Sequence, residues 1–157
     1  MCQSLPVTAL HQLGWATVTV WLVVNLVNAL QSIGFVLRPS RGMGPNRRIG
    51  LVIAALAVPA GAALVQLIRQ GSAQWVGPAV FVTFVILMLV VDYWRPIEFR
   101  APPLSSVLVP YLVLFFGGIV AMGAPMFWLD RGLWAVTVAT SVLLVTSMVF
   151  AQHKGQL

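Results

Sequence analysis

The chain has 157 residues, of which 60% are hydrophobic and only 8% are charged, and its formal net charge is +6. A soluble domain carries roughly 25% charged residues because its surface faces water, so this composition excludes an ordinary soluble protein. The positive charge does not indicate a nucleic-acid partner, since basic residues beside apolar segments are the usual consequence of membrane insertion.

Five long apolar segments predict the fold class. Each has about the length that an α-helix requires to cross a hydrocarbon core roughly 30 Å thick. We therefore expect an all-α, polytopic membrane protein whose one membrane-embedded domain is a bundle of five transmembrane helices. The expected spans are residues 13–37, 49–68, 75–91, 104–127 and 133–151.

The first segment carries the polar side chains Asn25, Asn28 and Ser32. Their spacing places them on one face of a helix. Exposing amide groups to hydrocarbon is unfavourable, because their donors and acceptors go unpaired there. We expect this face to point into the bundle, where it forms interhelical hydrogen bonds or, alternatively, a polar lining for a ligand or for water.

The gap after this segment, residues 38–48, contains two glycines and two prolines, which favour a loop over a helix. Its arginines include Arg41, Arg47 and Arg48. We expect these side chains to set the orientation of the chain and to contact anionic lipid headgroups at the cytoplasmic face. The alternative is a site for a phosphate-bearing ligand at the start of the second helix.

The second segment contains a stripe of small residues, which permits close packing of helices in membranes. Pro59 predicts a kink within it, because proline removes one backbone hydrogen bond. The short second gap, residues 69–74, predicts an antiparallel hairpin with the third segment. The stripe consists of Gly50, Ala54, Ala57 and Gly61.

The third segment ends in the densest polar stretch of the chain. We interpret this stretch as a cluster of ion pairs at the cytoplasmic interface, where such pairs contribute only about 0–1 kcal/mol. The alternative is that its carboxylates pair with the arginines of the first gap. The cluster consists of Asp92, Arg95, Glu98 and Arg100.

The fourth and fifth segments repeat some of these features. Pro110 predicts a second kink, and Gly117 with Ala121 forms a further step of small residues that favours close packing. The short turn around Asp130 predicts a second hairpin, between the fourth and fifth helices.

The distribution of basic residues predicts the orientation. Cytoplasmic loops hold the excess of arginine and lysine, so we expect the N-terminus outside and the C-terminus in the cytoplasm, in a plasma (inner) membrane. The first gap, the third gap and the tail share one side and hold Arg38, Arg41, Arg47, Arg48, Arg95, Arg100 and Lys154, whereas the other side holds only Arg69 and Arg131.

The sequence contains no recognisable motif for a metal, a cofactor or a catalytic nucleophile, and we expect none of the three. The only carboxylates are Asp92, Glu98 and Asp130, and all of them lie at the ends of the apolar segments. Proton-coupled carriers generally use an ionisable group within the membrane, so this placement argues against that class.

These observations favour a non-enzymatic accessory, scaffold or assembly component of a membrane complex, with a protein partner or a second copy of the chain bound through the small-residue stripes. The alternative is a carrier or binding protein for a lipid-like or small neutral molecule. A weaker hypothesis is an enzyme that acts on phosphorylated lipid at the cytoplasmic face, which requires the first and third gaps to lie close together.

Overall fold

The computed structural model describes residues 13–41, 44–94 and 104–153, and within these ranges the chain is helical apart from its turns. Five helical stretches are long and apolar enough to cross a membrane, as a multi-pass integral membrane protein requires. The prediction of an all-α chain with five such helices is confirmed. The stretches are Trp15–Leu37, Arg47–Arg69, Ala73–Trp94, Ser105–Leu129 and Arg131–His153.

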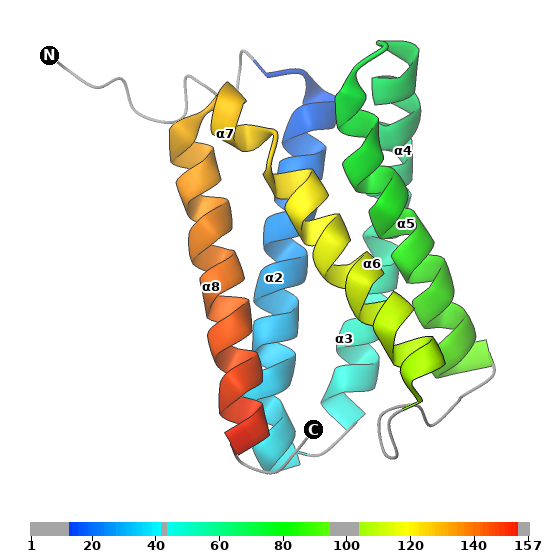
Figure 1. Ribbon diagram of the computed structural model, residues 1–157, viewed down its shortest axis with the longest axis vertical. Helices are drawn as coiled ribbons and strands as arrows, with labels where there is room; N and C mark the ends of the chain where they lie inside the picture. The colour runs from blue at the N-terminus through cyan, green and yellow to red at the C-terminus, as the bar shows by residue number, and fades with distance from the viewer. Residues whose placement is uncertain (1–12, 42–43, 95–103, 154–157) are drawn as a thin grey trace, which may run out of the picture.

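The central helix is α2 (Trp15–Arg41), which packs against α3 (Gly44–Ala55), α4 (Ala57–Arg69), α6 (Ser105–Gly123) and α8 (Arg131–His153) (Figure 1). Beyond α4 lies the third span, made of the 3₁₀ turn η1 (Ala73–Trp75), α5 (Val76–Leu89) and the π-helical turn η2 (Val90–Trp94). The short helix α7 (Met126–Leu129) connects α6 to α8.

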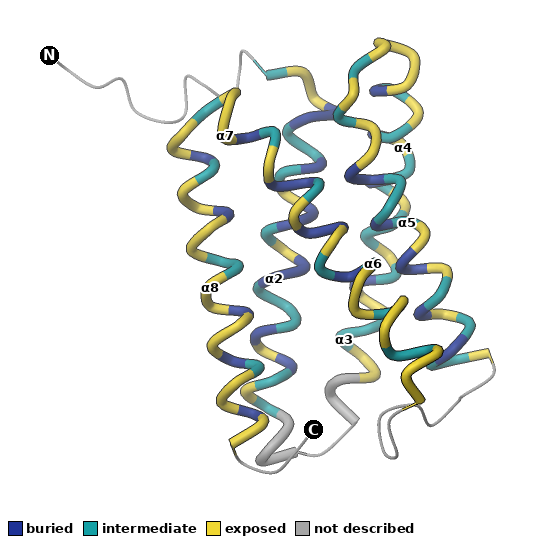
Figure 2. Tube along the Cα trace, in the orientation of Figure 1, coloured by how far each residue is buried: buried dark blue, intermediate teal, exposed yellow. Residues whose placement is uncertain are grey.

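The core lies where α2, α4, α5 and α6 meet. Buried valines of α2, among them Val24 and Val27, face this centre. On the other side Phe84 is completely buried, and its ring centroid lies 5.2 Å from those of Tyr111 and Phe115. The outward faces of the helices are exposed (Figure 2), and many of the exposed side chains are large and apolar. That surface matches a hydrocarbon solvent rather than water.

The second span is interrupted near its proline. Helix α3 ends at Ala55 and α4 begins at Ala57, so the break lies just before Pro59. Proline cannot donate the usual hydrogen bond and its ring crowds the preceding turn, which explains the break. Helix α6, in contrast, continues through Pro110 without interruption.

The expected loop at residues 38–48 is wrong in its extent. Helix α2 continues to Arg41, and α3 already begins at Gly44. The first N–H groups of a helix have no intrahelical partner, so Pro45 fits the first turn of α3. Pro39 lies in the last turn of α2, close to the end of the helix.

A tight turn connects α4 to the third span. Gly71 has φ of +64°, and its N–H bonds to the carbonyl oxygen of Ile68 while the N–H of Ser72 bonds to that of Leu67. This pair of bonds is a Schellman motif, in which glycine tolerates the left-handed backbone. The turn brings α5 back antiparallel to α4, and the two helices pack against each other.

Helices α5 and α6 approach closely through glycines. A Cβ atom on Gly77 would lie 2.8 Å from the carbonyl oxygen of Ala121 and 2.9 Å from the Cα of Met122. One turn along α5, the backbone of Phe81 lies beside Gly118 of α6. Small residues allow this proximity, and the resulting van der Waals contact is a main attraction between helices in lipid.

The second expected hairpin is correct in its tight connection but not in its packing. Helix α8 follows α6 after the short α7, yet it packs mainly along α2 and touches α6 near their joined ends (Figure 1). The two helices diverge from that contact because α6 packs along α5, whereas α8 packs along α2.

We predict that Gly77→Ala lowers the unfolding free energy by about 1–3 kcal/mol, because the added methyl group meets backbone atoms that cannot move aside locally. Gly61→Ala is the control, since a Cβ there meets nothing within 4 Å. It should be neutral or stabilising by up to about 1 kcal/mol, through helix propensity. Thermal unfolding in detergent measures both, and equal stability of the two variants would contradict the close contact.

Candidate functional site

The polar face of α2 lies against α8. Asn25 Nδ2 donates to Thr137 Oγ1 at 3.3 Å, and Asn25 Oδ1 accepts from Thr140 Oγ1 at 2.8 Å. One turn earlier, Trp21 Nε1 donates to the carbonyl oxygen of Leu133 at 3.0 Å. These interhelical bonds begin a continuous polar seam between the two helices.

Asn28 continues the seam from a completely buried position. Its Nδ2 donates to Thr140 Oγ1 at 3.1 Å and to Ser141 Oγ at 3.0 Å. Its Oδ1 is buried and accepts no hydrogen bond. Ser32 is also buried, but its hydroxyl donates within α2 to the backbone oxygen of Asn28 at 2.7 Å. Asn25 and Asn28 therefore connect the two helices, whereas Ser32 bonds to its own helix.

The hydroxyl groups of α8 are already committed as donors. Thr137 donates to the carbonyl oxygen of Leu133 at 3.2 Å, and Ser141 donates to that of Thr137 at 2.8 Å. Their oxygens remain as acceptors, which is the role that the asparagine amides require. We call this set the α2–α8 seam; it comprises Trp21, Asn25, Asn28, Leu133, Thr137, Thr140 and Ser141.

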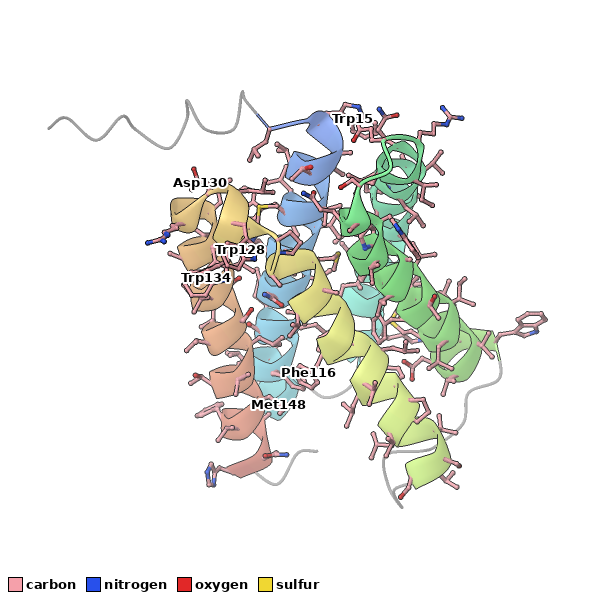
Figure 3. The ribbon with its side chains drawn as sticks, turned by 45° about the horizontal axis from the view of Figure 1, so that its top comes forward. Trp15, Phe116, Trp128, Asp130, Trp134 and Met148 are labelled. Carbon is pink, nitrogen blue, oxygen red and sulfur yellow. The ribbon has the colours of Figure 1, made fainter. Side chains whose placement is uncertain are left out.

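A groove of about 500 Å³ lies between α6 and α8. At one end the helices are close, since a Cβ on Gly123 would lie 2.8 Å from Thr137 Cγ2. Along the groove the walls are mostly apolar, with Trp134 near the α7 end and Phe116 farther along (Figure 3). The back of its α8 wall is the seam, because Thr137 and Ser141 belong to both.

Asp130 organises the α7 end of this groove. Its Oδ1 accepts a hydrogen bond from the backbone N–H of Leu133 at 2.9 Å, which caps the start of α8. The neighbouring Arg131 places its guanidinium 5.8 Å from the centre of the Phe127 ring, and Phe127 in turn packs edge-on against Trp134. Asp130 thus has a structural role, beside an exposed arginine.

At the opposite end of the bundle, Tyr93 of η2 joins the third span to the second. Its hydroxyl donates to the carbonyl oxygen of Arg47 at 2.6 Å, and the guanidinium of Arg47 lies 5.5 Å from the ring centre. A Cβ on Gly50 would lie 2.5 Å from the same hydroxyl, so a larger residue at this position would displace the Tyr93 hydroxyl. The ends of the first and third gaps are therefore brought together here.

Of the expected cytoplasmic ion-pair cluster of Asp92, Arg95, Glu98 and Arg100, the structure describes only Asp92; of the separate arginines expected at lipid headgroups, it describes the side chains of Arg47 and Arg48. Asp92 Oδ2 accepts a hydrogen bond from the hydroxyl of Tyr111 at 3.3 Å, and Arg48 is exposed. The side chain of Arg41 and the whole of Arg95, Glu98 and Arg100 lie outside the described residues. Within the described ranges, no group of three acidic, histidine or cysteine side chains is arranged to hold a metal ion.

Sequence reasoning identified the polar face of α2 but not its partner helix, and it missed the groove. The run of Thr137, Thr140 and Ser141 was a usable signal, since its hydroxyls share a face of α8. The groove left no such signal, because it depends on the divergence of two helices. Comparison of the chain with known protein families, curated proteins and solved structures finds no match.

We predict that Asn28→Asp destabilises the protein more than Asn28→Leu. The leucine variant loses two interhelical bonds, each contributing about 0.6 kcal/mol in membranes, and also removes the unpaired oxygen. The aspartate variant places an acidic group at a completely buried mid-span position, where a charge costs about 2.5–3.5 kcal/mol. Unfolding curves in detergent at neutral pH give the order, and the reverse order would contradict the seam.

Proposed function

We propose that the protein is a non-enzymatic accessory or assembly component of a membrane complex, which contacts its partner through the outward face of α6. In this proposal the N-terminus is outside and the C-terminus is cytoplasmic. The partner is either another membrane protein or a second copy of the chain. The observation that supports the proposal is the environment of Gly117.

Gly117 is exposed, and a Cβ atom there would meet nothing within 4 Å. Its neighbour Gly118, in contrast, is packed beside Phe81 of α5. Glycine within a helix is less favourable than alanine by about 1 kcal/mol, and Gly117 gains no packing inside the chain in return. Close approach by a helix from outside is the arrangement in a membrane that makes such a residue favourable.

The residues around Gly117 fit a helix contact. Val113 and Val120 lie one turn away on either side, and both are more than half exposed, at 63% and 66%. The intervening glycine leaves a depression between two branched side chains, into which a partner helix can pack. Since no hydrophobic force drives helices together in lipid, such shape complementarity supplies the attraction.

A second candidate function is the binding of a lipid-like molecule, and the groove between α6 and α8 favours it. The asparagines of α2 do not themselves line this groove, because their side chains are directed into the seam. A ligand would instead meet the apolar walls, so the polar-lined path expected from Asn25, Asn28 and Ser32 is not the basis of this candidate.

We predict that Gly117→Leu weakens the complex about tenfold or more, since overpacking costs about 1–3 kcal/mol and about 1.4 kcal/mol corresponds to a factor of ten. Ala139→Leu is the control, because it adds similar bulk at an exposed position on α8. Gentle extraction from native membranes, followed by native mass spectrometry, measures the bound partner or second copy.

Circular dichroism should show that both variants remain folded. The proposal fails if the unmodified protein is extracted as a lone monomer, or if Gly117→Leu retains its partner as well as Ala139→Leu does.

A further inference from the structure

We infer that the groove between α6 and α8 binds a single phospholipid, with an acyl chain along the groove and the phosphate at Arg131. This site borders the proposed partner contact at Gly117, with which it shares Val120, but its argument does not depend on that contact. The inference rests on the chemistry of the walls, the length of the groove and the charge at its α7 end.

The walls suit a hydrocarbon chain better than a polar solute. The lining hydroxyls of Thr137, Ser141 and Thr146 all donate to carbonyl oxygens of α8 itself. Two of them also accept from the asparagines of the seam. The remaining lining is apolar, including Phe116, Val138 and Val142. A polar solute would lose its hydration here without gaining bonds in return, whereas a methylene chain loses nothing.

The length of the groove matches one leaflet. Its α8 wall extends from Trp134 to Thr146, about 18 Å along the axis at about 1.5 Å per residue. One leaflet occupies half of a hydrocarbon core roughly 30 Å thick. The volume of about 500 Å³ also lies within the range of about 300–1,000 Å³ that is typical of small-molecule binding pockets.

The groove suits an acyl chain of a lipid rather than a helix of a partner protein. An α-helix with its side chains is about 10–12 Å across. At the α7 end of the groove, α6 and α8 are so close that a methyl group on Gly123 would contact Thr137. At this end the narrow floor, flanked by the small residue Ala124, admits an extended chain lying over it but gives a helix no depth to enter.

The headgroup end has the charge and the aromatic side chains that a phospholipid requires. Arg131 is exposed, and a guanidinium can bind a phosphate through two hydrogen bonds. The adjacent Asp130 directs its Oδ1 to the backbone N–H of Leu133, and the guanidinium of Arg131 lies 5.8 Å from the ring centre of Phe127, which packs against the groove residue Trp134. Trp128 is 85% exposed and lies at the same end as Asp130 and Trp134 (Figure 3), where amphipathic rings favour the membrane interface.

The test uses delipidated, full-length protein in detergent, titrated with dioleoylphosphatidylglycerol and followed by native mass spectrometry. Val138→Trp fills the groove and should lower lipid binding at least tenfold. Val136→Trp is the matched control, because Val136 is similarly exposed on α8 but does not line the groove. Val142→Trp fills the groove farther along and serves as the second variant if Val138→Trp does not fold.

A second set of titrations separates the contribution of the lipid phosphate to binding from that of the acyl chain. Arg131→Gln should weaken binding of the phosphatidylglycerol several-fold and leave binding of dioleoylglycerol, which has no phosphate, unchanged. Equal lipid binding by the groove-filling variants and Val136→Trp would overturn the inference. The inference would also be overturned if Val138→Trp displaced a bound polypeptide rather than a lipid. It would be overturned as well if the Arg131→Gln variant bound the phospholipid as tightly as the unmodified protein does.

Discussion

The need to pair the amides of Asn25 and Asn28 is the constraint on which the arrangement of the bundle depends. Hydrocarbon offers no hydrogen-bond partners, so polar groups of a membrane helix must find them within the protein. Helix α8 supplies these partners as Thr137, Thr140 and Ser141. The first and last spans therefore pack together, and α8 packs along α2 rather than along α6, its neighbour in the chain.

A second interaction, which involves no polar groups, holds α6 against α5 and away from α8. Gly77 and Gly118 let α5 and α6 approach until a methyl group at Gly77 would meet backbone atoms. Helix α6 packs along α5 through this contact and therefore does not lie along α8, which the α2–α8 seam holds against α2. The groove is the geometric result of these two demands, and its closed end lies at Gly123 and Thr137.

The two ends of the bundle are stabilised by different local contacts. At one end Asp130 caps α8, beside the aromatic group of Phe127 and Trp134. At the other end the contact of Tyr93 with Arg47 ties the third span to the second. Between the ends, the helices expose apolar surface that includes Gly117, where a Cβ atom would meet nothing within 4 Å. Contacts with lipid and with other membrane components are the interactions that such a surface offers.

The sequence by itself determined the five spans, because the length of an apolar run reports directly on the solvent that surrounds it. It also indicated that the face of Asn25 and Asn28 is shielded from lipid, since the cost of exposing amides is independent of the fold. Only the tertiary structure decided which helix covers that face, and that Gly118 rather than Gly117 faces α5. Adjacent residues differ by about 100° around a helix, and that rotation is set by side chains from distant segments, which no local pattern contains. The groove follows from the same tertiary packing.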